Sequence, residues 1–267
     1  MDSRPDYVDR AFRSVYYGGD YEREMDSFAK RWQALSFEAF TQALERGTPE
    51  EKAVALFALS YSDNPNAQGI LSTALESVEP LEQWASALCL GERKDERALH
   101  VLLSCLQALL PPRLHPLERE GGLYHFWRMK VAALLGEWGR KDSIPALRQA
   151  LETTWKLEQA DTIDRKHVWH DYQDELVYAL GRLEAFGALV GFTLPLQRLQ
   201  FWMVLFVCGV LQAKSRYGDL LTQVQIDRTL RSEIADVLEQ RFGVPPEKQT
   251  AYIDSYAQTY FDRRSWV

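Results

Sequence analysis

The sequence predicts an all-α protein that folds as an α-α superhelix, a row of stacked helix pairs with helical caps at both ends. The first observation is that one apolar pattern recurs four times along the chain. The second is that the apolar residues in each copy are spaced as on one face of a helix. The third is that glycine and proline, 15 and 11 of 267 residues, are too few for long linkers. The copies are therefore expected to follow one another closely.

The four copies align on one shared position, which we call the anchor. The anchors are Ser60, Gly91, Gly136 and Gly181. Each anchor follows two apolar residues, which are Ala58 and Leu59, Cys89 and Leu90, Leu134 and Leu135, and Ala179 and Leu180. Small or apolar residues also stand seven, eleven and fifteen places after the anchor, namely Ala67, Leu71, Leu75; Ala98, Leu102, Leu106; Ser143, Leu147, Leu151; and Ala188, Phe192, Leu196. Steps of four residues mark one helix face, so each copy is predicted to contain two helices joined by a turn.

The turn within each copy is predicted from its glycine and aspartate residues. A glycine anchor suits the C-terminus of the first helix, and Asp63, Asp95 or Asp142 suits the N-cap of the second. Pro145 falls in the first turn of its helix, where proline is tolerated. Because neither helix can bury its apolar stripe alone, successive pairs are expected to stack into a continuous core.

The third copy resembles a HEAT repeat of the short bacterial kind, similar to those of phycobilin-lyase-like proteins. Between Met129 and Glu152 it contains the run A-x-x-L-G-x-x-G-x-x-D-S-I-P-A-L-x-x-A-L. The other copies match more loosely, and the resemblance covers roughly residues 48–196. It implies an α-α superhelix, but it implies no single function because such repeats serve many unrelated scaffolds.

The predicted organisation has three parts. A helical cap over residues 1–47 precedes four helix pairs over 48–197, and further helices follow over 198–267 as degenerate repeats or a second cap. The anchors are 31, 45 and 45 residues apart, so two copies carry extra residues, near 108–126 and 153–171. Insertions at equivalent points of a solenoid are expected to emerge on the same edge.

Composition and charge argue against several classes of protein. A formal net charge of -7 and a pI of about 5.4 argue against nucleic acid as the partner. The charged N-terminus resembles no secretory signal, so a cytoplasmic location is expected. The longest apolar run, Phe201 to Leu211, is too short to cross a bilayer core of roughly 30 Å and predicts a buried helix. Cys89, Cys105 and Cys208 lack paired spacing and are expected to be buried thiols.

The most metal-like cluster is His167-x-x-His170-Asp171, because histidines three apart share a helix face and carboxylates complete a site. Asp174 and Glu175 follow it, and a charged helix start explains the same residues. We expect no metal, no cofactor and no catalytic residue. Deoxyhypusine hydroxylase, an iron-binding HEAT-repeat family, presents His-Glu dipeptides, and this sequence contains none.

Two alternatives of another class are a HEAT-like DNA glycosylase and a bilin lyase, a groove enzyme or ligand carrier. The first would use a basic surface with tryptophans, which the sequence matches in part at Trp127, Arg128, Lys130, Trp138, Arg140 and Lys141. The second rests on the shared repeat style alone.

The favoured expectation is a non-enzymatic scaffold that binds a protein or peptide through its concave face and the two extra segments. On the concave second helices the expected contact residues are Leu103, Gln107, Arg148 and Glu152. In or beside the extra segments they are Arg113, His115, Tyr124, Trp127, Arg128, Trp155, Trp169 and Tyr172. Aromatic and basic residues on segments that the repeat does not require resemble the anchors of a recognition surface.

Overall fold

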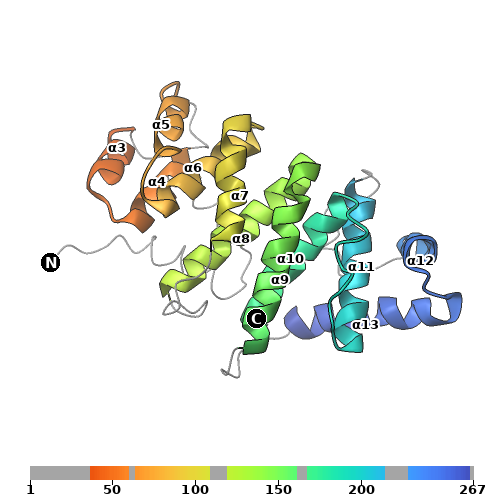
Figure 1. The fold of residues 1–267 in the computed structure, drawn as a ribbon. Helices are drawn as coiled ribbons and strands as arrows, with labels where there is room; N and C mark the ends of the chain where they lie inside the picture. The colour runs from red at the N-terminus through yellow and green to blue at the C-terminus, as the bar shows by residue number, and fades with distance from the viewer. Residues whose placement is uncertain (1–36, 60–63, 109–118, 161–166, 214–227, 265–267) are drawn as a thin grey trace. The chain divides into compact units, whose positions relative to one another are not determined.

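The protein is described from a computed structural model, which covers residues 37–59, 64–108, 119–160, 167–213 and 228–264 (Figure 1). Every regular element in these ranges is a helix, which confirms the predicted all-α class. The chain divides into two compact units, Met1–Leu134 and Leu135–Val267. Each unit has its own buried core.

Unit 1 contains the first two predicted helix pairs. Its helices are α3 (Phe37–Arg46), α4 (Pro49–Leu59), α5 (Ala67–Ala74), α6 (Pro80–Glu92), the 3-10 helix η1 (Glu96–Ala98), α7 (Leu99–Gln107) and most of α8 (Arg119–Trp138). Helix α6 is central, because α4, α5 and α7 all pack against it (Figure 1). Helix α3 packs on α4, in the region predicted as the N-terminal cap, of which residues 1–36 lie outside the described ranges.

Unit 2 is built around one apolar helix. After the end of α8 its elements are the 3-10 helix η2 (Lys141–Ser143), α9 (Ile144–Ala160), α10 (His167–Arg182), α11 (Leu196–Ala213), α12 (Arg228–Phe242) and α13 (Pro246–Arg264). Helix α10 packs against both α9 and α11. Helices α12 and α13, which follow α11 in the sequence, also pack against α11. Residues 201–211 of α11 are all buried, as the apolar run predicts.

Helix α11 is, in the described part of the chain, the one helix long and apolar enough to cross a membrane by length and composition. Within unit 2, however, 61% of its residues are buried. That degree of burial is typical of the core helix of a folded domain, and α10, α12 and α13 supply the contacts.

The repeat positions predicted to be apolar form the core of the first three copies. Leu59, Leu90 and Leu135, each directly before an anchor, are 0% exposed. The positions seven, eleven and fifteen after the anchor are also buried in these copies, from Ala67 to Leu151. Each pair therefore buries one stripe from both of its helices, as expected.

The fourth copy departs from the prediction. Its first helix, α10, is present, but turns occupy residues 186–191 where a second helix was predicted, and the next helix begins only at Leu196. Phe192 is half-buried and Leu196 is 66% exposed. Gly187, Gly191 with φ +95° and Pro195 interrupt the apolar spacing, and each disfavours a helix interior. Helix α11 packs on α10 instead.

Nearly all described residues of the two extra segments are helical, where the sequence had predicted insertions outside the helix pairs. Residues 119–126 begin α8, residues 153–160 end α9, and residues 167–171 begin α10. Thr154 and Glu158 continue the buried stripe of Leu147 and Leu151 at helical spacing, so the α9 helix has a reason to continue. Residues 109–118 and 161–166 lie outside the described ranges.

The turn after each anchor has the same backbone conformation in copies two, three and four. The residue three places after the anchor has a positive φ, 57° at Lys94, 76° at Gly139 and 54° at Glu184. The next amide donates to the carbonyl five residues before it, as from Asp95 to Leu90 at 3.0 Å. These are Schellman-type helix ends. The left-handed residue lies three places after the anchor, and the anchor glycines lie in the last turn of their helices, at the predicted C-terminal end.

The anchor glycines are needed for close packing between helices. A Cβ atom at Gly136 would lie 2.9 Å from the Cα of Ala179 on α10. At Gly181 it would collide with the backbone of Phe206 on α11. A side chain at either position would therefore push two helices apart.

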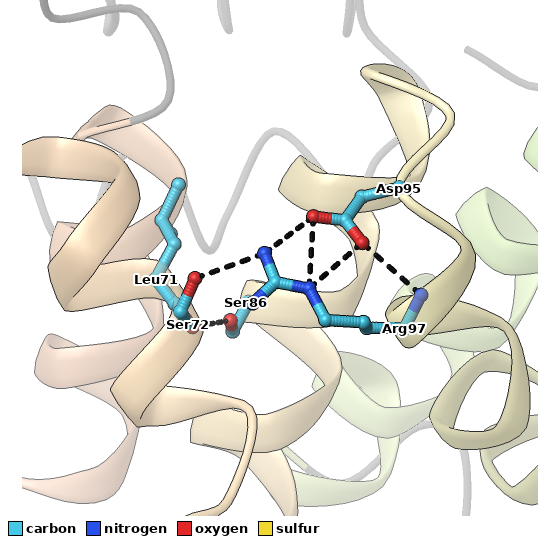
Figure 2. Close-up of polar contacts among 5 residues, drawn as sticks. All are labelled: Leu71, Ser72, Ser86, Asp95 and Arg97. Atoms are coloured by element: carbon cyan, nitrogen blue, oxygen red, sulfur yellow. Dashed lines mark hydrogen bonds and ion pairs between the residues drawn. The ribbon is translucent and has the colours of Figure 1, made fainter.

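The aspartates of the turns have different roles in the second and third copies. Asp95 is the N-cap of η1, where its side chain accepts a hydrogen bond from the Arg97 amide, as predicted. Figure 2 shows the Arg97 side chain, which pairs with Asp95 at 2.6 Å and donates to Ser72 of α5 at 3.2 Å. These hydrogen bonds from Arg97 hold the pKa of the Asp95 carboxyl below its usual value.

In the next copy the same two turn positions carry the opposite charges. Arg140 stands where the earlier copy has Asp95, and Asp142 stands where it has Arg97. The two side chains pair at 2.7 Å. Asp142 therefore lies inside η2 and not at its N-cap, which corrects the prediction, and Asp63 falls outside the described ranges.

Candidate functional site

Five of the predicted contact residues have side chains that reach the surface. Leu103 is half-buried and Gln107 is exposed on α7. On α9, the Arg148 and Glu152 side chains are each 43% exposed, and Trp155 is half-buried. Leu103 and Arg148 stand twelve places after their anchors, and Gln107 and Glu152 stand sixteen places after theirs. The second helices of copies two and three thus present side chains at equivalent repeat positions.

Three predicted contact residues belong to the core, and their assignment to a contact surface is corrected. Trp127, Arg128 and Tyr172 are 2%, 4% and 1% exposed. The Trp127 ring meets Phe57 edge-on at 5.9 Å. Arg128 lies over the Trp84 ring at 5.8 Å and donates a hydrogen bond to the Ala108 carbonyl.

Helical spacing explains this burial. Because α8 begins at Arg119, Trp127 is in register with the buried residues Val131 and Leu135. In the same way, Tyr172 is in register with the buried Leu176 in α10. On loops these side chains would have been free to face solvent, but on helices their direction follows from that of the neighbouring core residues.

The side chains of the remaining four predicted contact residues lie outside the described part of the chain. Arg113 and His115 lie outside the described residues. Tyr124 and Trp169 lie within α8 and α10, but their side chains are outside the described part.

The surface of α9 is organised as one stripe. Pro145, Arg148, Glu152 and Trp155 are spaced three, four and three residues apart, so they share one face of the helix. Arg148 Nε lies 3.1 Å from Glu152 Oε1, and an Arg148 Nη2 donor reaches the Val190 carbonyl at 3.2 Å. The opposite face of α9 is buried through Leu147, Ala150, Leu151 and Thr154.

The half-buried Trp155 packs on the fully buried ring of Trp202. The two rings meet edge-on with centroids 6.1 Å apart, and Phe192 contacts Trp202 at 5.7 Å. The Trp202 indole donates to Asp174 Oδ1 at 3.1 Å. Trp202 is therefore fixed by packing and by a hydrogen bond, and it supports two half-buried aromatic side chains at the surface.

A buried polar network joins α9, α10 and α11 below this surface. Glu158 receives a hydrogen bond from Gln173 at 2.9 Å and contacts His170 Nε2 at 3.0 Å. Arg198 donates to Gln173 at 2.8 Å and lies 3.4 Å from Asp174 Oδ1. The Glu158 side chain is only 7% exposed, and Gln173 is fully buried. The network compensates buried charge with specific partners.

Burial and hydrogen bonding act in opposite directions on Glu158. Burial raises the pKa of its carboxyl, but the hydrogen bonds from His170 and Gln173 and the nearby charges of His170 and Arg198 outweigh this. The pKa of Glu158 is therefore lower than usual, and the side chain stays ionised at neutral pH.

Sequence reasoning singled out His170 and Asp174 but missed Glu158, Gln173, Arg198 and Trp202. One signal was available for Glu158, because it stands seven residues after the buried Leu151 on the core face of α9. No pattern in a single sequence pairs it with α10 and α11.

Within the described residues, no group of three or more His, Cys, Asp or Glu side chains is arranged to hold a metal ion. In the predicted metal-like cluster, His170 contacts Glu158, and the side chains of His167 and Asp171 are outside the described part. The three cysteines are buried thiols outside any disulfide, as predicted, and burial raises the pKa of Cys105 and of Cys208 to about 12.

Comparison of the chain with protein-family models, with curated proteins and with solved structures finds no match. The likeness to HEAT repeats thus rests on the sequence motif.

Proposed function

We propose that this chain is a HEAT-like helical scaffold that binds a protein or peptide through the exposed side chains of its second helices, without catalysis. The observation that carries the proposal is the equivalent placement of Leu103 with Arg148 and of Gln107 with Glu152 in successive copies. An exposed face that repeats from copy to copy suits an extended partner.

The chemistry of this face supports a protein partner. In unit 1 the exposed positions carry an apolar side chain and an amide, and in unit 2 they carry a guanidinium and a carboxylate, with Trp155 on the same helix. Protein interfaces mix apolar and polar groups in this way, and Trp and Arg are enriched at their energetic centres. The net charge of -7 is the wrong sign for a general nucleic-acid surface.

The test compares Arg148→Glu with a matched control, Arg231→Glu. Both arginines pair with a carboxylate on the surface of unit 2, at 3.1 Å and 3.0 Å, and their side chains are 43% and 41% exposed. The 267-residue chain is immobilised and exposed to a lysate of its source cell. Retention of a partner should fall at least about tenfold for Arg148→Glu and stay unchanged for Arg231→Glu.

Both variants should melt within a few degrees of the unchanged chain, because surface substitutions typically cost about 0.5 kcal/mol or less. Equal retention by all three proteins would contradict the proposed surface. A groove enzyme or ligand carrier of the glycosylase or bilin-lyase kind would be indicated instead if the native protein carried a bound chromophore, seen in its absorbance and native mass.

A further inference from the structure

The exposed stripe of α9 is symmetric in its apolar and charged positions, and its two charges are opposite in sign. It begins with an apolar residue, Pro145, continues with the charges of Arg148 and Glu152, and ends with an apolar residue, Trp155. The spacings of three, four and three residues are also symmetric about the middle of the stripe. A helix with such a stripe is complementary to a second copy of itself when the two run antiparallel.

From this order we infer that α9 is a site of self-association, where the α9 helices of two chains pair antiparallel about a twofold axis. The inference rests on the proposed function, because it uses part of the same surface and names a second copy of this chain as the partner. Arg148 of each chain lies opposite Glu152 of the other, and Trp155 lies opposite Pro145.

Charge complementarity selects a second copy over an unrelated partner. In the twofold arrangement two Arg148–Glu152 contacts form between the chains, one on each side of the axis. Arginine has five N–H donors, so Arg148 can keep its contacts with Glu152 and Val190 of its own chain and also donate across the axis. A parallel arrangement would place arginine against arginine and glutamate against glutamate.

Apolar side chains beside the stripe enlarge the contact. Val190 is 68% exposed, and its carbonyl accepts from Arg148. Trp155 and Phe192 are half-buried against Trp202, so their exposed edges are held in place before association. An interface of one helix and a short turn segment is small, which predicts a weak dimer with a Kd of about 1–100 μM.

The decisive experiment mixes two single variants of the full chain and measures mass by sedimentation equilibrium. Arg148→Glu places glutamate against Glu152 of the second copy, and Glu152→Arg places arginine against Arg148. Each variant alone should dimerise at least about tenfold more weakly than the unchanged chain. An equimolar mixture should regain dimerisation, because one chain then presents two glutamates and the other two arginines. An effect confined to the ion pair within one α9 helix would not be rescued by mixing.

Two further proteins complete the experiment. The double variant Arg148→Glu with Glu152→Arg should dimerise like the unchanged chain, and Arg231→Glu should leave the dimer intact. A chain that stays monomeric up to about 100 μM, or a mixture that stays monomeric, overturns the inference. If the chain is monomeric while Arg148→Glu still loses a lysate partner, self-association fails and the proposed function stands. If the chain dimerises as described but retains no other partner, the proposed function reduces to self-association.

Discussion

The residue that takes the left-handed position in the helix-ending turns differs among the copies. It is Lys94 in the second copy, Gly139 in the third and Glu184 in the fourth. A side chain with a Cβ atom is strained in this conformation, whereas glycine is not. The left-handed conformation is therefore strained at Lys94 and Glu184 but not at Gly139.

The first prediction follows from this difference. Lys94→Gly should raise the free energy of unfolding by about 0.5–1 kcal/mol, because relief of strain outweighs the greater freedom of glycine in the unfolded chain. The converse change, Gly139→Ala, should lower it by about 1 kcal/mol. Urea unfolding followed by circular dichroism measures both values, and a loss of stability in Lys94→Gly would show that its side chain makes a contact worth more than the strain.

The second prediction concerns the dependence of stability on pH. The pKa of Glu158 in the folded protein lies below its usual value of 4.5, so ionised Glu158 stabilises the fold above the unfolded pKa. This contribution should disappear as pH falls through the folded pKa. Glu158→Gln should therefore flatten the acid limb of a plot of unfolding free energy against pH.

At neutral pH the same change should cost about 1–3 kcal/mol, because His170 and Arg198 lose a buried anionic neighbour. Glu152→Gln, on the exposed stripe of the same helix, is the control and should leave both the limb and the stability nearly unchanged. An unaltered acid limb in Glu158→Gln would mean that other carboxyls dominate acid unfolding.

At the scale of elements, glycines of two kinds occur within helices. Gly181 of α10 packs directly on the backbone of Phe206, whereas a Cβ at Gly69 of α5 would meet nothing within 4 Å. The third prediction compares alanine at these positions. Gly181→Ala should destabilise the protein by about 1–3 kcal/mol through overpacking, and Gly69→Ala should stabilise it by up to about 1 kcal/mol through helix propensity. Thermal unfolding of the two variants gives the sign directly.

Helix positions could be read from the sequence wherever an apolar stripe had steps of four residues. The stripe through Leu135, Leu147 and Leu151 predicted the third pair, and all three residues are fully buried. The second helix predicted in the fourth copy does not form, because Gly187, Gly191 and Pro195 disfavour a helix more strongly than the apolar spacing of Ala188 and Phe192 favours one. The helical parts of the extra segments were missed because their many polar residues interrupt the apolar pattern although the helix continues.

The candidate site was less predictable than the helices. Aromatic and basic residues predicted to bind include Trp127 and Tyr172, which are core residues, because residue type alone does not tell a buried ring from an exposed one. Glu158 went unnoticed because its partners come from α10 and α11, and pairing across helices leaves no trace in one sequence. Arg148 and Glu152 were predicted from their repeat position, and their side chains are accessible.

For the molecule as a whole, the α-α superhelix remains a prediction that scattering can test. A stack of helix pairs is longer than a compact particle of the same mass, for which about 18 Å is the expected radius of gyration at 267 residues. Small-angle scattering of the monomer should give a clearly larger value. A value near that of a compact domain would argue for two packed subdomains in place of a continuous superhelix.

The buried thiols also report on motions of the two units. Cys89 and Cys105 belong to unit 1, and Cys208 belongs to unit 2. A thiol reagent attacks the thiolate, and burial both covers these sulfurs and keeps Cys105 and Cys208 protonated. Alkylation of each cysteine therefore has to wait for its own unit to open. The rate of alkylation of each cysteine therefore reports how often its own unit opens. Peptide mass spectrometry after timed labelling shows whether the cysteines of the two units react at the same rate.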